Sequence, residues 1–167
     1  MRRSVTLAAT VAVGVVGGSS IAEAQTPQER VKRGQYLATI MDCGGCHTPG
    51  ALVGKPDHAL HLAGSDVGFQ VPGLGVFYPP NLTSDRETGL GTWSEKDIAK
   101  AVRTGERPDG RMLVPVMPWP NYAKLTDADA LALGTYIKSL KPIRRQAPAM
   151  VGASQKPIAP YLSLVQP

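Results

Sequence analysis

The feature that most constrains this chain is the pentad Cys43-Gly44-Gly45-Cys46-His47, which contains both cysteines of the 167-residue sequence. Its two thiols lie three positions apart on one short turn, and a histidine follows directly. The two glycines between them carry no side chain, so the turn can approach a bulky neighbour closely. The pentad therefore indicates a site built from two sulfur atoms and an imidazole.

Three kinds of site contain cysteines at this spacing, and two of them fit poorly. A thioredoxin-like dithiol requires a βαβ pattern nearby, which the sequence does not show. A plain disulfide over so short a loop would constrain the unfolded chain little. Zinc would take Cys43, Cys46, His58 and His61, at spacings just outside those of zinc fingers. That set would leave His47 without a role.

A covalent haem anchor gives every residue of the pentad a role. Each thiol can add to one vinyl group of the porphyrin, and His47 then lies under the ring, where it can bind iron. Aromatic residues make up only 5% of the chain, beside 18 glycines and 15 prolines, so the protein core is modest and a large apolar group would complete it. We therefore predict one haem c on Cys43 and Cys46, with His47 as the proximal ligand.

Residues 1–24 show the order of a secretory signal peptide. Arg2 and Arg3 precede an apolar run over residues 5–16, and the small residues of an A-x-A site end at Ala24. The run is shorter than the roughly 20 apolar residues of a membrane span. We expect export to the periplasm, cleavage after Ala24, and no transmembrane segment after signal removal. Covalent haem attachment is completed outside the cytoplasm, so the signal and the pentad support each other.

The charge balance is mildly basic. The formal net charge of the chain is +5, without a run of lysines or arginines, and this pattern excludes nucleic acid as an expected partner. A mild positive charge instead favours a partner protein with an acidic docking face.

Three helices are predicted, with irregular segments between them. Their capping signals and apolar spacing place them at about residues 27–42, from Ser94 onward, and from Thr126 to Leu140. Residues 48–92 show no convincing periodicity, and so long a loop in a compact protein indicates a function or a wrapped group. Residues 25–142 are expected to form one domain, followed by a Pro-rich extended tail over residues 143–167.

The sixth ligand of the iron has several candidates. They are Met112, Met117, Met150, His58 and His61. We favour Met117, because it lies in the segment LVPVMPWP, where prolines on both sides stiffen the backbone that would present its sulfur. Met112, five residues earlier in the same loop, is the runner-up.

These residues resemble a known family, the monohaem class I cytochromes c of bacterial periplasms. The likeness covers about residues 28–140 and rests on CGGCH, YPPNLTSDRETGLGTWSEKDI and PDGRMLVPVMPWPNYAKLTDADALAL. Within the class, the chain is similar to the haem domains of cytochrome c subunits of bacterial dehydrogenases. Such subunits often carry three haem domains, whereas this sequence has one. The resemblance implies an all-α class I cytochrome c fold, with three to five helices around one covalently bound haem and long irregular loops.

The resemblance also implies roles for further residues. It implies Met117 as the distal ligand, a close crossing of Gly34 and Tyr36 or Leu37 against Tyr136, and haem contacts for three residues. Those three are Asn81, Thr83 and Trp93, which we expect to line the haem or to bind its propionates.

The expected function is that of a periplasmic electron carrier with no catalytic residues of its own. A dehydrogenase subunit would be its donor, and a cytochrome or oxidase of a respiratory chain its acceptor. The alternative is a peroxidase-like haem enzyme or a haem sensor with a labile distal ligand. The sequence offers no distal His or Arg constellation for catalysis, since Arg107 and Arg111 are expected on a loop surface.

Overall fold

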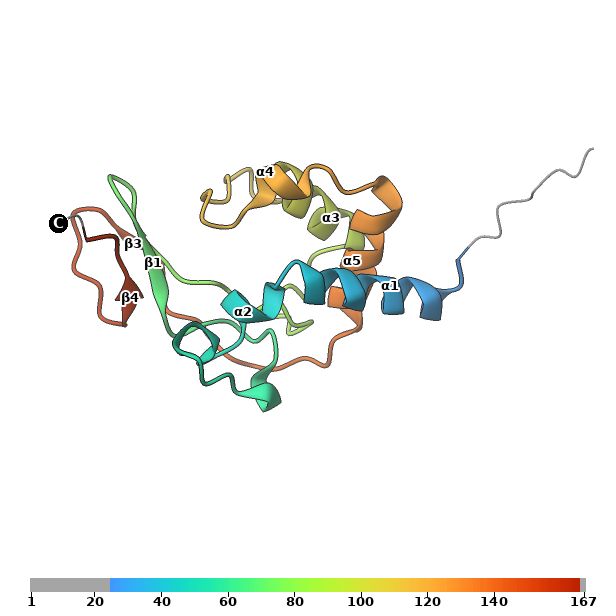
Figure 1. Cartoon of the computed structure of the whole chain (residues 1–167), viewed down its shortest axis with the longest axis horizontal. Coiled ribbons are helices and arrows are strands. Elements are labelled where there is room, and N and C mark those ends of the chain that lie inside the picture. The colour runs from blue at the N-terminus through green and yellow to red at the C-terminus, as the bar shows by residue number, and fades with distance from the viewer. Residues whose placement is uncertain (1–24, 166–167) are drawn as a thin grey trace, which may run out of the picture.

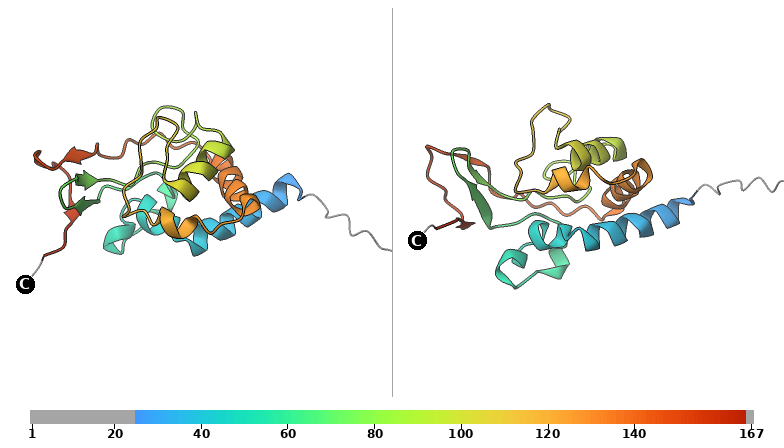
Figure 2. Two further views of the ribbon diagram at one scale, coloured as in Figure 1. Left: turned by 90° about the horizontal axis from the view of Figure 1, so that it is seen from above. Right: turned by 45° about the horizontal axis from the view of Figure 1, so that its top comes forward.

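The computed structural model describes residues 25–165 (Figure 1), and the predicted signal peptide lies outside these residues. The helices are α1 (Pro27–Ile40), α2 (Cys43–His47), α3 (Glu95–Thr104), α4 (Trp119–Tyr122) and α5 (Asp127–Ser139), with short 3₁₀ turns at Ala51–Val53 and His58–Leu60. The strands are β1 (Gly68–Val71), β2 (Gly75–Phe77), β3 (Val151–Gly152) and β4 (Tyr161–Leu162). Helices α1, α3 and α5 gather at one end of the molecule, and the sheet lies at the other (Figures 1 and 2).

The three predicted helices are present, and their capping signals act as expected. Thr26 and Ser94 each form a capping box, with Glu29 and Asp97 respectively, and the Thr126 side chain accepts a hydrogen bond from the backbone N–H of Asp129. Each bond satisfies an N–H that the first helical turn leaves without a partner. The first helix ends at Ile40 rather than at residue 42, because the chain turns there into α2.

Helices α1 and α5 cross at the predicted glycine. A Cβ atom on Gly34 would lie 2.0 Å from the carbonyl oxygen of Ala132 and 2.6 Å from the Cβ of Tyr136. Leu37 is buried beside this contact, whereas Tyr36 is 54% exposed, so Leu37 is the residue that enters the crossing. Gly34 therefore sets how closely the two helices approach.

The core forms where α1, α3 and α5 meet. Its buried members are Leu37, Ala38, Leu62, Ile98, Val102, Leu133, Tyr136 and Ile137. A rim of partly buried side chains packs against it, among them Met41, Cys43, Leu82, Leu90, Trp93, Met117, Tyr122 and Leu125. Both the pentad and the methionine loop thus border the same apolar core.

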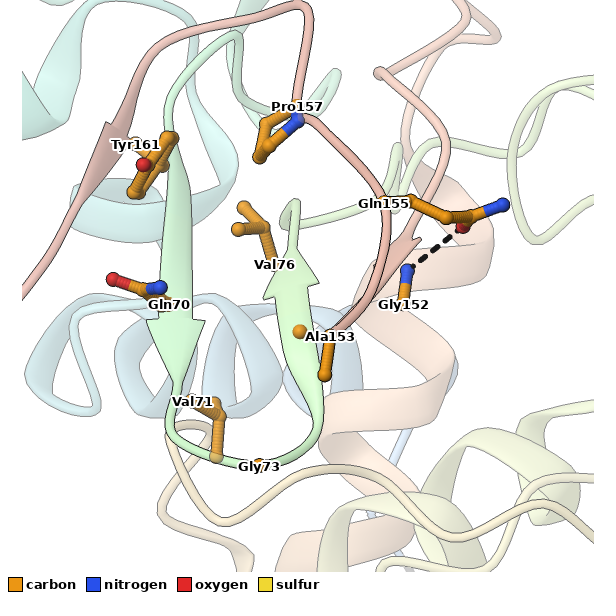
Figure 3. A pocket seen from close by; sticks show the side chains of 10 residues that line it. Gln70, Val71, Gly73, Val76, Gly152, Ala153, Gln155, Pro157 and Tyr161 are labelled. Carbon is orange, nitrogen blue, oxygen red and sulfur yellow. Dashed lines mark hydrogen bonds between the residues drawn. The ribbon is translucent and has the colours of Figure 1, made fainter.

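The expectation of a purely helical fold was wrong, because the chain also forms a mixed four-stranded sheet in the order β3-β2-β1-β4. β1 and β2 pair as an antiparallel hairpin, and the tail adds β3 antiparallel to β2 and β4 parallel to β1. The strands are only two to four residues long, so no alternating run marks them in the sequence, and β3 and β4 pair with the hairpin across 75 to 93 positions. A small cavity of about 120 Å³ lies between hairpin and tail, where Gln155 accepts a hydrogen bond from the Gly152 N–H at 3.1 Å (Figure 3).

Helix α4 was also missed, because it lies in the proline-rich segment that was read as irregular. Pro120 stands in its first turn, where the absent N–H costs nothing. None of the helices between residues 25 and 165 combines the length and apolar character needed to cross a bilayer.

We predict that Gly34→Ala destabilises the protein. Helix propensity alone would stabilise the variant by about 1 kcal/mol, but the added methyl group would overlap the Ala132 carbonyl, and overpacking of this kind costs about 1–3 kcal/mol. Urea unfolding, followed by circular dichroism, measures whether the free energy of unfolding falls or rises. Gln35→Ala, on the exposed neighbour in the same helix, is the control and should change stability little. An unfolding midpoint above that of the wild type would contradict the crossing.

Acid should weaken the link between α1 and α5. The Arg33 Nε donates to Asp129 Oδ1 at 2.7 Å, and this bond lowers the pKa of Asp129. A carboxyl with a depressed pKa stabilises the fold above its unfolded pKa, and this contribution is lost as the pH falls through the folded value. The free energy of unfolding should thus decrease as the pH is lowered past about 4. The decrease should be less steep in Asp129→Asn and in Arg33→Gln. Equal slopes in all three proteins would refute this link.

Candidate haem site

The pentad forms a short helix of its own. Asp42 begins it in the left-handed region, at φ 53°, and its carboxylate accepts the Gly45 N–H at 3.1 Å. A Cβ on Gly45 would lie 2.2 Å from that carboxylate, so a larger residue at this position would displace the Asp42 side chain from its capping bond. The pentad thereby begins directly at the C-terminal end of α1.

His47 is fixed by one hydrogen bond. Its Nδ1 lies 2.8 Å from the carbonyl oxygen of Pro80, which can only accept, so Nδ1 carries the hydrogen and donates it. Burial lowers the pKa of His47, and the bond to Pro80 offsets part of that effect. The imidazole is therefore neutral, and its Nε2 keeps a lone pair for a metal ion, which is the state of a histidine ligand with an oriented ring.

The two cysteines are free thiols, each partly buried. Burial raises the pKa of Cys43 to about 11, and burial followed by the nearby Asp42 raises the pKa of Cys46. Catalytic dithiols have depressed pKa values that expose a thiolate. The environment of Cys43 and Cys46 raises the pKa of both thiols instead, so it does not support the thioredoxin-like interpretation.

The two candidate methionines lie in different surroundings. Met117 is partly buried against the same core as Cys43 and Trp93, whereas Met112 is 56% exposed and pairs through its backbone with Glu106. Met117 thus packs against the core that Cys43 also borders, whereas Met112 is largely exposed to solvent.

The loop around Met117 is held by its own backbone. Its N–H donates to the Val114 carbonyl at 3.1 Å, and its carbonyl accepts the Trp119 N–H at 2.7 Å. The indole N–H of Trp119 donates in turn to the Leu113 carbonyl at 3.2 Å. Together with the prolines on either side, these bonds limit the conformations that the Met117 backbone can adopt.

Trp93 packs against the core, and Arg107, which was expected on a loop surface, lies over its ring. The guanidinium carbon of Arg107 lies 5.1 Å from the centroid of the Trp93 ring, within the range of a cation–π contact. Arg107 is therefore not a free loop residue, whereas the side chain of Arg111 is 59% exposed and pairs with Asp109 at 3.1 Å.

Asn81 and Thr83 are almost completely buried, and their polar atoms have protein partners. The Asn81 Nδ2 donates to the Ile143 carbonyl at 2.7 Å, and its Oδ1 accepts both the N–H and the hydroxyl of Thr83. The Thr83 hydroxyl oxygen accepts the N–H of Ile143 at 3.1 Å. These contacts attach the tail to the domain, so a haem contact for either residue stays a prediction.

His58 and His61 lie at the glycine side of the pentad helix. With Gly44, Gly45 and Thr39 they line a cavity of about 380 Å³, and His61 is the side chain nearest to the position of a Cβ on Gly44. Within residues 25–165, no group of three or more His, Cys, Asp or Glu side chains is arranged to hold a metal ion. The zinc interpretation therefore finds no support in the geometry.

Two functional contacts were not found from the sequence. Pro80 fixes His47 through its carbonyl, and a carbonyl carries no sequence signal. Tyr122 donates its hydroxyl hydrogen to the carbonyl oxygen of Met41 at 3.0 Å, which joins the methionine loop to the end of α1, two residues before the pentad. In the sequence, the only indication of a role for Tyr122 is that it lies five residues after Met117.

The residues present fit a haem. They supply two unbonded thiols, a neutral imidazole with a free Nε2, a thioether on a stiff loop, and a rim of apolar side chains. This donor set of nitrogen and sulfur suits iron in a porphyrin.

The chain belongs to the cytochrome c family. The family model described as cytochrome c matches residues 31–141, which include the pentad, α3, the methionine loop and α5. The cofactor of this family is covalently bound haem c, and the CxxCH motif of this chain runs from Cys43 to His47.

Similar proteins are cytochrome subunits of bacterial dehydrogenases. The chain is 33% identical over 147 residues, 87% of its length, to the cytochrome c subunit of alcohol dehydrogenase (quinone) from Gluconobacter oxydans (strain 621H). It is 38% identical over 124 residues, 74% of its length, to the gluconate 2-dehydrogenase cytochrome c subunit of Pantoea cypripedii. It is 36% identical over 120 residues, 71% of its length, to the fructose dehydrogenase cytochrome subunit of Gluconobacter japonicus. The matches cover 29%, 26% and 23% of these relatives, so the chain spans less than a third of their length.

We predict that Asn81→Ala releases the tail. The substitution leaves the buried carbonyl of Ile143 and the Thr83 hydroxyl without their Asn81 partner, at a cost of about 1–3 kcal/mol. Trypsin should then cleave after Arg144 and Arg145 faster than in the wild type, as followed by mass spectrometry. Asn121→Ala, at an exposed asparagine, is the control. Equal cleavage rates in the two variants would show that Asn81 does not hold the tail.

Proposed function

We propose that this chain is a c-type cytochrome that transfers single electrons and performs no catalysis of its own. In this proposal Cys43 and Cys46 hold the haem covalently, His47 is the proximal ligand and Met117 the distal one. The observation that carries the proposal is that one apolar core is bordered by Cys43 of the pentad and by the thioether of Met117, which lies far along the chain.

Each residue has a distinct part in this role. When bound, the haem supplies an iron that alternates between its ferrous and ferric states. Pro80 fixes the ring of His47 so that Nε2 keeps its lone pair, and the hydrogen-bonded loop limits the motion of the Met117 sulfur. With His47 and Met117 both bound, the iron would have no open position for a substrate. Rigidly held ligands favour rapid electron transfer, because the ligands rearrange little when the iron changes oxidation state.

The proposed electron donor and acceptor are inferred from the similar dehydrogenase subunits and from the net charge of the chain. The three relatives are cytochrome subunits of dehydrogenases, so we propose a dehydrogenase subunit as donor and a cytochrome or oxidase of a respiratory chain as acceptor. The positive charge of the chain favours acidic docking faces, with association that weakens as salt is added. The signal-like residues 1–24 support a periplasmic location.

The competing function is a haem enzyme or sensor whose distal ligand leaves the iron. The partly buried position of Met117 and the fixed backbone around it argue against a labile ligand. Slow or absent binding of carbon monoxide and cyanide by the purified protein would favour the carrier, and rapid binding would favour the enzyme or sensor.

The central test is Met117→Ala. We expect this variant to retain covalent haem, to lose the sulfur-to-iron absorption band, and to lower its reduction potential by on the order of 0.1 V or more, because axial ligands set potentials over roughly 0.8 V. Mass analysis, absorption spectroscopy and protein-film voltammetry give these three readouts. Met112→Ala, at the exposed methionine, is the matched control and should keep the wild-type potential. The ligand assignment is wrong if Met117→Ala keeps the band and the potential.

A further inference from the structure

Two segments carry the groups of the site. The attachment segment, residues 41–47, contains the pentad, and the methionine segment, residues 113–122, contains Met117 and α4. Among the described residues, one hydrogen bond joins the attachment segment to the methionine segment, from the Tyr122 hydroxyl to the Met41 carbonyl at 3.0 Å. The other end of the methionine segment is attached to the end of α3, where the Leu113 N–H donates to the Gly105 carbonyl at 2.7 Å.

The acceptor of this bond is a carbonyl at the C-terminal end of α1. The last carbonyls of a helix have no partner within it, and Met41 lies at the junction where α1 stops and α2 begins. No backbone N–H of the described chain donates to the Met41 oxygen. Tyr122 therefore satisfies an acceptor that the helix geometry leaves open.

The donor is suited to a lasting contact. The ring of Tyr122 packs against the core, and burial, followed by the nearby cysteines, raises the pKa of its hydroxyl to about 12. The hydroxyl thus keeps its hydrogen at any physiological pH. A hydrogen bond in such surroundings is stronger than one in water.

We propose that Tyr122 is a positioning residue that holds the methionine segment against the attachment segment and so keeps Met117 on the iron. This inference rests on the proposed function, since it requires Met117 as the distal ligand. Detachment of Met117 requires its segment to move away from the pentad. That movement breaks the bond to Met41. Loss of the bond therefore raises the free energy of every state in which the Met117 sulfur is detached from the iron.

The test is Tyr122→Phe, which removes the hydroxyl and keeps the ring. Added imidazole competes with Met117 for ferric iron, so its dissociation constant reports how firmly the sulfur is held. Loss of one net hydrogen bond should tighten imidazole binding about two- to tenfold. The sulfur-to-iron band should also disappear at a lower urea concentration than in the wild type, ahead of the loss of helix signal.

Tyr78→Phe is the matched control. The hydroxyl of Tyr78 donates to the Ala159 carbonyl at 2.8 Å, which is the same kind of bond, but it joins the hairpin to the tail. The control should unfold at lower urea concentration and bind imidazole as the wild type does. Tyr122→Leu, which also removes the ring, should bind imidazole more tightly than Tyr122→Phe and covers the case in which the first variant folds poorly.

The outcomes separate this inference from the proposed function. A wild-type protein without a sulfur-to-iron band would overturn the function and the inference together. A wild-type band with equal imidazole affinity in Tyr122→Phe, Tyr78→Phe and the wild type would overturn only the inference. Tighter binding in Tyr122→Phe alone supports it.

Discussion

The close approach of α1 to α5 is the contact on which the other features depend. The contact is made at Gly34, which has no side chain, so the backbone carbonyl of Ala132 packs directly against the backbone of α1. The C-terminal end of α1 is thereby placed against the core, and only two residues separate that end from the pentad helix. A displacement of α1 along α5 would carry both thiols and the imidazole with it.

The second organising feature is that each proposed ligand is held by groups outside its own side chain. The carbonyl of Pro80 sets the ring of His47, and backbone bonds of the loop set the position of Met117. Tyr122 then joins the two segments across 81 positions of sequence. A small protein core can hold a large cofactor in this way, because fixed backbone contacts supply rigidity that few buried side chains could provide.

Local signals made much of this arrangement predictable. The capping residues Thr26, Ser94 and Thr126 mark helix starts through bonds to the next few residues, and CGGCH contains its chemistry within five positions. The sheet and the contacts of Asn81 could not be predicted, since they join segments far apart through backbone atoms that every residue possesses. The preference for Met117 over Met112 rests on the prolines around it and stays a prediction; Met117 is partly buried against the core, and Met112 is exposed.

Pro80 and Asn81 are neighbours in the chain, and each holds a different segment: Pro80 contacts His47, and Asn81 contacts the start of the tail. One peptide unit separates the carbonyl that orients His47 from the amide that holds the tail at Ile143. A displacement of the tail at Ile143 would therefore act on Asn81, whose backbone N–H belongs to the same peptide group as the carbonyl that His47 contacts.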